Sequence, residues 1–434
     1  MNFGPVYFNG RGAQLNRTLV RSDFSWRLHK DLEWTVGKLS LEKKLNVHRG
    51  PVNSVCWSST GQQLLTGSDD RNLVISTPFH SEPKGETIFS GHQANIFSAK
   101  FLPHTDDQKV ASAAGNGRVS LIDLGVADGL EVARSFASHL SAVFDLVTSQ
   151  WEAGVFFSVS GDGTIRQFDV REAHCGCSLL LGNQHCSPSG YTAAALHPIS
   201  AGRRLFVATR DGEILEFDRR RLPSAEPVWL SRTAQKSAGS NCRISSLEFD
   251  HSGHRLLASY AGGSICLFDV AAGSSKDAEI ACSSSSPAGY ALLREYRGHR
   301  NSRTCIQQAT FWGSEHILSG SDCGHLMVWR ISDSSLIAAR QADQCLVNRV
   351  AAHPQLLCLA TSGMERDVKI WSPMQHGEDA GQRDQSDLAY ATELARRNQQ
   401  MLGCSDLLSA RVAAMPNMAV PPPAGLLEAG LLPS

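Results

Sequence analysis

The chain has 434 residues, and its 41 Lys and Arg nearly balance its 42 Asp and Glu, for a formal net charge of −1. This balance argues against a general nucleic-acid or membrane-surface binder, and no apolar run approaches the ~18 residues of a membrane span. Because the twelve cysteines lack disulfide or zinc spacing and Met1–Gly12 lacks a signal-like apolar run, we expect a soluble protein of the nucleus and cytoplasm.

Residues 1–38 form an N-terminal extension with one predicted helix, Ser22–Gly37. Ser22 is a suitable N-cap, Asp23 lies in the first turn, and Gly37 ends the pattern. Apolar side chains recur every four residues and would form one stripe along the helix: Phe24, Leu28, Leu32 and Val36. The helix could pack on the rim of the chain's own folded domain or bind a partner, and the sequence favours neither.

From residue 45 to 371, short strands alternate with Gly, Asn, Asp and Ser, the residues of tight turns. The pattern repeats seven times when aligned on the last core position of the third strand: Ser76, Ile122, Phe168, Phe217, Phe268, Trp329 and Trp371. The spacings are 46, 46, 49, 51, 61 and 42 residues, against ~40–45 for a four-stranded propeller blade. Several repeats also carry an upstream His and an Asp in the turn before the third strand, as His139 and Asp162 do.

These repeats predict an all-β fold, a seven-bladed WD-repeat β-propeller over residues 39–373. A strand within Leu39–His48 would complete the last blade, which leaves no sheet edge unpaired. The recurring His and turn Asp would hydrogen-bond to a strand Ser or Thr, because a scaffold needs such a set in many repeats and an active site needs it once. We therefore predict a protein that is not an enzyme and has no catalytic residue, metal or cofactor.

Two consecutive repeats end in the same box, Phe168–Arg171 (FDVR) and Phe217–Arg220 (FDRR). Adjacent blades would place the two arginines side by side on one face, where guanidinium forks suit carboxylates and carbonyls of a partner. The alternative is that an Arg in this position is ordinary blade chemistry. The candidate partner-binding residues are Phe168, Asp169, Arg171, Phe217, Asp218 and Arg220, with Phe24, Leu28 and Leu32 of the N-terminal helix.

On the opposite face we expect the loops that carry Gly-His to recognise a second protein, since exposed loops on a rigid scaffold commonly carry binding. The candidate residues are Arg300, Asn301 and Arg303 before the sixth blade, with Asn95 and Phe97 before the second. The alternative is that these residues tie one blade to the next.

Two further segments lie outside the repeats. Residues 273–289 are rich in Ser and read as a flexible surface insertion. Residues 374–434 form a C-terminal tail in which Asp384–Leu402 could be a helix, with Glu393 and Arg397 as an i,i+4 pair, and Met415–Ser434 is expected to be disordered.

The two boxes resemble those of the WD-repeat substrate receptors of cullin-four RING ubiquitin ligases. Asp162 and Asp211 stand where that family's box has its earlier Asp, so the resemblance adds both residues to the candidate partner-binding set. The chain is most similar to the nuclear-receptor-interaction-protein type of that family, over nearly the whole propeller. The stretches that carry this resemblance are Leu45–Trp57, Gly67–Phe79, Ser90–Pro103, Tyr296–Thr304, Phe311–Trp329 and Asp367–Pro373.

The resemblance implies a non-enzymatic receptor that docks on the β-propeller adaptor of the ligase and presents target proteins for ubiquitination. The partners would be that adaptor, the cullin-four RING ligase and targets that the sequence does not name, with no direct nucleic acid and no membrane. Two other hypotheses are a WD-repeat scaffold of another nuclear or cytoplasmic complex, and a hydrolase or nucleotide-binding propeller. The last would need a non-repeating acid/base or metal set, which the sequence does not offer.

Overall fold

The structure is a computed structural model. It describes residues 30–80, 85–125, 132–172, 177–182, 190–222, 227–231, 243–262, 264–270, 291–373 and 387–401. The predicted residues Phe24 and Leu28 and the insertion 273–289 lie outside the described residues.

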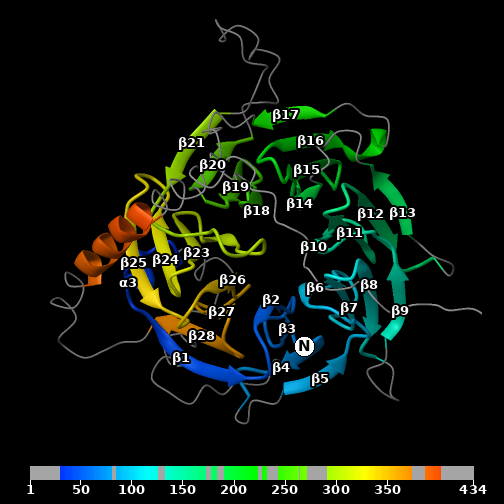
Figure 1. Ribbon diagram of the computed structural model, residues 1–434, viewed down its shortest axis with the longest axis horizontal. Helices are drawn as coiled ribbons and strands as arrows, with labels where there is room; N and C mark the ends of the chain where they lie inside the picture. Colours follow the sequence, from blue (N-terminus) through cyan, green and yellow to red (C-terminus); the bar gives the residue numbers. More distant parts are fainter. Residues whose placement is uncertain are drawn as a thin grey trace, which may run out of the picture.

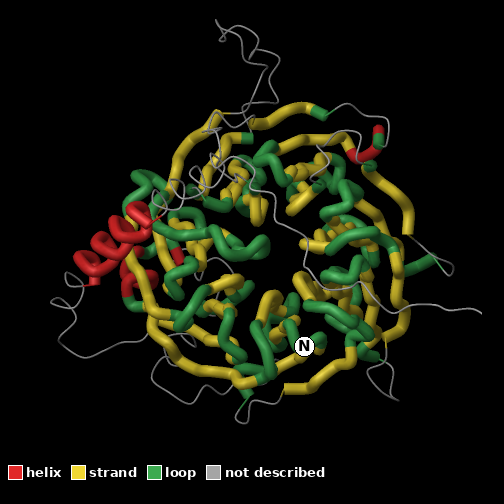
Figure 2. Tube along the Cα trace, viewed as in Figure 1, coloured by secondary structure: helices red, strands yellow, loops and turns green. Residues whose placement is uncertain are grey.

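Seven four-stranded antiparallel sheets are arranged as blades around one axis (Figure 1). In each blade the first strand is nearest the axis and the last strand lies at the rim, as the strand tubes in Figure 2 also show. The strands of the first three blades are β2–β5 (Val52–Trp57, Leu64–Ser68, Asn72–Ser76, Gly85–Phe89), β6–β9 (Ile96–Phe101, Lys109–Ala114, Arg118–Asp123, Val132–Ala137) and β10–β13 (Val143–Thr148, Val155–Ser160, Ile165–Asp169, Cys177–Leu181).

Blades four to six continue the pattern, and blade seven takes its outer strand from the start of the chain. Their strands are β14–β17 (Tyr191–Leu196, Arg204–Thr209, Ile214–Asp218, Val228–Ser231), β18–β21 (Ile244–Phe249, Arg255–Tyr260, Ile265–Asp269, Ala291–Tyr296), β22–β25 (Ala309–Trp312, His316–Gly320, His325–Arg330, Leu336–Gln341), and β26–β28 with β1 (Val347–Ala352, Leu359–Gly363, Asp367–Pro373, Leu39–Asn46).

The seven-bladed propeller expected from the repeats is confirmed. All seven aligned positions lie in the third strand of a blade and are buried. The ring closes where β1 pairs antiparallel with β28, from Leu39 opposite Pro373 to Asn46 opposite Asp367. Because a strand from the beginning of the chain completes the last sheet, the two ends of the propeller are hydrogen-bonded to each other.

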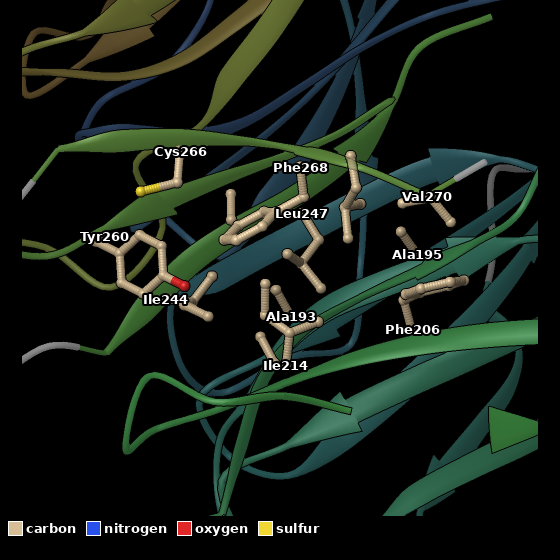
Figure 3. Packing of buried hydrophobic residues seen from close by; sticks show 13 residues of the cluster. Ala193, Ala195, Phe206, Ile214, Ile244, Leu247, Tyr260, Cys266, Phe268 and Val270 are labelled. Atoms are coloured by element: carbon tan, nitrogen blue, oxygen red, sulfur yellow. The ribbon is translucent and has the colours of Figure 1, made fainter. Parts of the chain in front are cut away.

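The hydrophobic core lies mainly between neighbouring blades. Figure 3 shows Ala193, Phe206 and Ile214 of blade four facing Ile244 and Phe268 of blade five. Similar clusters join the other pairs of blades, for example Leu65 and Leu73 of blade one with Ile96 and Val110 of blade two. Each blade therefore buries its faces against its neighbours, as repeat architectures do.

The His and turn Asp form the internal hydrogen-bond set that the repeats predicted. In blade one His48 contacts the Asp70 carboxylate at 3.0 Å and the Thr66 hydroxyl at 2.8 Å. In blade three His139 contacts Asp162 at 3.2 Å and Ser158 Oγ. These side chains satisfy one another's buried polar atoms, which is a scaffold role.

The predicted helix Ser22–Gly37 is not continuous over the part that the structure describes, residues 30–37. The helical pattern is interrupted at Asp31 and Leu32, and only α3, Glu33–Gly37, follows. Both Thr35 N and Thr35 Oγ1 donate to the Leu32 carbonyl, which starts a new turn there. Leu32 is half-exposed whereas Val36 is buried, so the predicted apolar stripe does not continue through Leu32.

The C-terminal tail contains a helix over residues 387–401, seen in orange beside blade six in Figure 1. Its buried side chains Ala391 and Leu394 join the core of blade six, which includes Trp329 and Met327. The predicted pair of Glu393 with Arg397 is replaced by an i,i+3 pair with Arg396, with 2.6 Å between Arg396 Nη2 and Glu393 Oε1. No helix of the described residues has the length and apolar character to cross a membrane.

Candidate docking surface

The propeller has two faces, which we name by their loops. The box face carries the loops between first and second strands and the ends of the third strands; the turn face carries the Gly-His loops and the turns between second and third strands. In blade three Val155 pairs with Asp169 at the box face and Val159 with Ile165 at the turn face. Each FDxR box thus ends on the box face and each turn Asp lies on the other.

The two boxes adopt the same geometry on adjacent blades. Arg171 donates from Nε to Asp169 Oδ1 at 2.9 Å and from Nη2 to Oδ2 at 2.5 Å. Arg220 donates from Nε to Asp218 Oδ1 at 3.1 Å and from Nη2 to Oδ2 at 2.7 Å. Both Arg side chains remain largely exposed, at 65% and 61%, so each fork presents its outer edge to solvent.

Each carboxylate also orders the backbone that follows it. Asp169 Oδ1 accepts from Arg171 N at 3.0 Å, and Asp218 Oδ1 accepts from Arg220 N at 3.1 Å, where it caps the 3₁₀ turn η2 (Arg219–Arg221). The side-chain hydrogen bonds with Arg171 lower the pKa of Asp169, and those with Arg220 lower the pKa of Asp218 to about 2. Both forks are therefore charge-paired at neutral pH.

A third arginine connects the two blades between these forks. Arg219 of blade four donates from Nη1 to Glu152 Oε2 of blade three at 2.7 Å, and its guanidinium lies 5.4 Å from the Phe157 ring centroid. Gly154 lies in the same loop, at φ +72°, and packs closely against the residue that follows the third strand of blade three. A Cβ at this position would lie only 2.4 Å from Val170 Cγ2. The loop 149–154 is thus fixed on both sides.

Four of the predicted partner-binding residues are not available on this face. Phe168 and Phe217 are buried in the cores of blades three and four, where Phe168 stacks on Phe156 at 4.8 Å. Asp162 lies at the turn face and accepts from His139, Leu140 N and Thr164. Asp211 lies in the equivalent turn, between β15 and β16. We correct the prediction for Phe168, Phe217 and Asp162, because they build the blades instead, whereas Asp211 is partly exposed on the turn face and stays a proposed contact.

Residues 30–33 of the N-terminal segment also lie on the box face, but on the opposite side of the ring from the two boxes. Lys30 Nζ donates to the His353 carbonyl of blade seven at 2.8 Å, and Asp31 accepts from Ser314 N and Oγ of blade six. Glu33 pairs with Arg330 at 2.6 Å. A partner that touches both Leu32 and the boxes would therefore have to span from blades six and seven to blades three and four (Figure 1).

The turn-face candidates divide into buried and accessible residues. Asn301 is 0% exposed and its Nδ2 donates to Ser245 Oγ at 2.8 Å and Ser259 Oγ at 3.1 Å, so it ties blade six to blade five. We correct the prediction that it contacts a target. Arg303 and Asn95 are exposed, while Phe97 is half-buried and stacks on Phe144 at 6.1 Å.

The C-terminal helix reaches the same loop. Asn398 Nδ2 donates to the Gly298 carbonyl at 2.9 Å, and a Cβ on Gly298, at φ +106°, would lie 2.6 Å from Ala395 Cβ. Arg300 is half-buried and its Nη1 lies 3.4 Å from Met401 Sδ. The end of this helix thus covers part of the loop for which we predicted target binding.

Sequence reasoning missed the apolar residues beside the forks. Trp151 is 55% exposed in the loop between β10 and β11, and Ile199 is 60% exposed in the matching loop of blade four. Trp151 Nε1 donates to the Pro198 carbonyl at 2.8 Å, across the two blades. Their signal in the sequence is weak, because one Trp and one Ile in separate loops form no repeated motif.

The repeat geometry and a family comparison agree on the class of protein. The family model of the WD domain, G-beta repeat, matches residues 39–75, which contain β1 and most of blade one. The chain is a WD40-repeat protein with a seven-bladed propeller.

Among curated proteins, the chain is 34% identical over 252 residues to human DDB1- and CUL4-associated factor 6, which covers 54% of this chain and 28% of that protein. The mouse protein of the same name is 34% identical over 250 residues, with the same coverage. The WD repeat protein iqw1 of Schizosaccharomyces pombe is 34% identical over 177 residues, or 38% of this chain and 22% of that protein. The matched stretches thus span less than a third of these relatives.

Proposed function

We propose that this protein is a non-enzymatic substrate receptor that docks on the β-propeller adaptor of a cullin-four RING ubiquitin ligase and presents target proteins. The observation that carries the proposal is the pair of identical Asp–Arg forks on one face of adjacent blades. Both forks hold their guanidinium edge outward on a rigid strand end, which is the arrangement that a docking partner's carbonyl or carboxylate oxygens can meet.

The similarity to a protein whose name records association with DDB1 and CUL4 supports the same function. On the stretches Leu45–Trp57 and Phe311–Trp329 we further propose the nuclear-receptor-interaction-protein branch of these receptors. The nucleus and cytoplasm stay our proposed location. Arg303, Asn95 and Phe97 stay proposed target contacts on the turn face, with Arg300 partly under the C-terminal helix.

The test replaces both outward guanidinium groups and measures adaptor binding. Arg171→Ala with Arg220→Ala should lose co-purification with the adaptor and cullin, because the two hydrogen-bonding edges disappear from the face. The melting temperature should hardly change, since exposed surface substitutions usually alter stability by less than ~0.5 kcal/mol.

A matched control is Arg297→Ala, which removes an equally exposed Arg that pairs with a nearby carboxylate, Glu295, beside blade five. It should leave adaptor binding unchanged. Wild-type protein that recovers another complex and no adaptor would favour the alternative, a WD-repeat scaffold of a different assembly. If the double variant still binds the adaptor, the two boxes have only a structural role within their blades.

A further inference from the structure

The box face carries an apolar spot that the proposed docking role leaves unexplained. Trp151 and Ile199 are more than half exposed on hydrogen-bonded loops of adjacent blades, on the same face as the Arg171 and Arg220 forks. Other large apolar residues that are at least half exposed in the described part of the chain lie elsewhere: Phe89, Leu179 and Leu292 on outer strands, Leu140 on the turn face, Tyr390 on the C-terminal helix, and Leu32 on the box face but across the ring. On this face, apolar and fork residues therefore gather at the joint of blades three and four.

Hydrogen bonds within the chain order the two loops of this spot and the Trp151 side chain. The Trp151 backbone N–H donates to Ser149 Oγ at 3.3 Å and its indole N–H donates to the Pro198 carbonyl at 2.8 Å. Ile199 N donates to His197 Nδ1 at 3.3 Å, and the Arg219–Glu152 ion pair fixes the loop beneath. A preordered aromatic side chain loses little conformational entropy on binding. More of the free energy gained by burying its ring therefore contributes to the affinity.

Charge alone cannot supply that affinity here. The three ion pairs at this joint, Arg171–Asp169, Arg220–Asp218 and Arg219–Glu152, carry no net charge together. The forks can orient a partner through hydrogen bonds, but each guanidinium already has a carboxylate. Interfaces with such a polar rim draw their energy from a desolvated apolar centre, where Trp is enriched.

We propose that Trp151 and Ile199 form the apolar centre of the adaptor-docking surface, with Arg171 and Arg220 as its polar rim. This inference rests on the proposed function. The partner site that fits is an apolar pocket on a propeller loop of the adaptor, edged by carbonyl or carboxylate oxygens that meet the two forks. Because the three ion pairs at the joint are neutral together, their contribution to binding should depend only weakly on salt.

The experiment measures the affinity of the purified full-length chain for the purified adaptor. Ile199→Asp places an unpaired charge in the proposed centre and should raise Kd by about 10-fold or more. Trp151→Ala should raise Kd to a similar extent. Trp151→Phe keeps much of the ring, so its Kd should lie between those of wild type and Trp151→Ala. The matched control is Leu140→Asp, on the same blade as Trp151 but 99% exposed on the other face, with a Kd within about 2-fold of wild type.

The outcomes separate this inference from the function on which it rests. Wild-type protein that fails to bind the adaptor overturns both. Wild-type binding that is weakened by the double Arg variant but not by Ile199→Asp or Trp151→Ala overturns the apolar centre alone. Should Trp151→Ala fail to fold, Ile199→Asp decides, because the Ile199 side chain projects into solvent. A steep loss of affinity between about 0.05 M and 0.3 M salt would also contradict a charge-neutral centre.

Discussion

Blade three and blade six share one strand pattern but are stabilised by different contacts. In blade three His139 contacts Asp162, Thr164 and Ser158, and the set is complete within the blade. In blade six the equivalent His299 is 1% exposed, and neither ring nitrogen has a hydrogen-bond partner among the described residues. The turn residue there is Cys323, which bonds to Ser321 Oγ in its own turn.

Blade six receives its support from the two ends of the chain. Helix 387–401 contributes Asn398, which donates to Cys323 Sγ at 3.4 Å, and Tyr390, whose hydroxyl lies 2.9 Å from His325 Nε2. Arg340 bonds to Asp387 of the helix at 2.8 Å and to the Leu39 carbonyl at 3.2 Å. A repeat that lacks its internal polar set can thus be stabilised by segments outside the repeats.

The largest expected effect comes from the helix that covers blade six. Leu394→Ala should lower the free energy of unfolding by about 2–4 kcal/mol, because Leu394 is buried in the blade-six core. Chemical denaturation measures the loss. Leu388→Ala, the same substitution on the exposed side of the same helix, should cost less than ~0.5 kcal/mol. Equal effects would mean that the helix does not stabilise blade six.

The turn residues of the two blades should differ in the same assay. Asp162→Ala removes the acceptor of His139, Leu140 N and Thr164 and should cost about 1–3 kcal/mol, since buried donors are left unpaired. Cys323→Ala removes no carboxylate and should cost less, about 1 kcal/mol. An Asp162→Ala variant as stable as wild type would contradict the role of the internal set in blade three.

The unpartnered His299 predicts a dependence of stability on pH. Burial lowers the pKa of His299 to about 4, whereas an unfolded His titrates near 6.5. The unfolded chain therefore binds more protons between these values, so this contribution is complete above about pH 6.5 and is lost as the pH falls towards 4.

His299→Phe should flatten the fall in melting temperature between pH 7 and pH 5 relative to wild type. His92, whose pKa burial also lowers to about 4, and His353 will maintain part of the slope, so the change should be partial. If the variant has the same pH profile as wild type, the His299 ring must have a hydrogen-bond acceptor in solution that keeps its pKa from being lowered.

The period of the repeats was enough to predict the fold. Seven aligned positions, tight-turn residues and a strand before the first repeat defined seven blades and their closure by β1. The sequence did not predict the break at Asp31 and Leu32. That break depends on contacts with Ser314 and His353, residues far along the chain, while local helix signals continue through it.

The candidate site was predictable only where it repeats. The boxes place Arg171 and Arg220 on one face because each follows the third strand of its blade. Asp162 and Asp211 were grouped with the boxes because of the resemblance, although the third strand of each blade carries its turn and its box to opposite faces of the ring. The Trp151–Pro198 contact joins loops of two blades, and nothing periodic in the sequence indicates it.

The smallest expected effect on stability concerns Cys323, which stands in blade six where other blades have the turn Asp. Its thiol should nevertheless differ clearly from an ordinary thiol in its reactivity. Burial raises the pKa of Cys323, but hydrogen bonds with His325, Ser321 and Asn398 outweigh it and lower the pKa to about 7. Because the thiolate is the nucleophile, alkylation of Cys323 by iodoacetamide should rise through pH 7 and level off near pH 8, as measured by peptide mass spectrometry.

Cys358 is the internal control, because burial raises the pKa of its thiol, and it should stay unlabelled in the folded protein. Asn398→Ala removes one of the bonds to the thiolate, so the labelling midpoint should move to higher pH. A Cys323 profile that follows an ordinary thiol, with a midpoint near 8.5, would mean that the helix leaves this turn in solution.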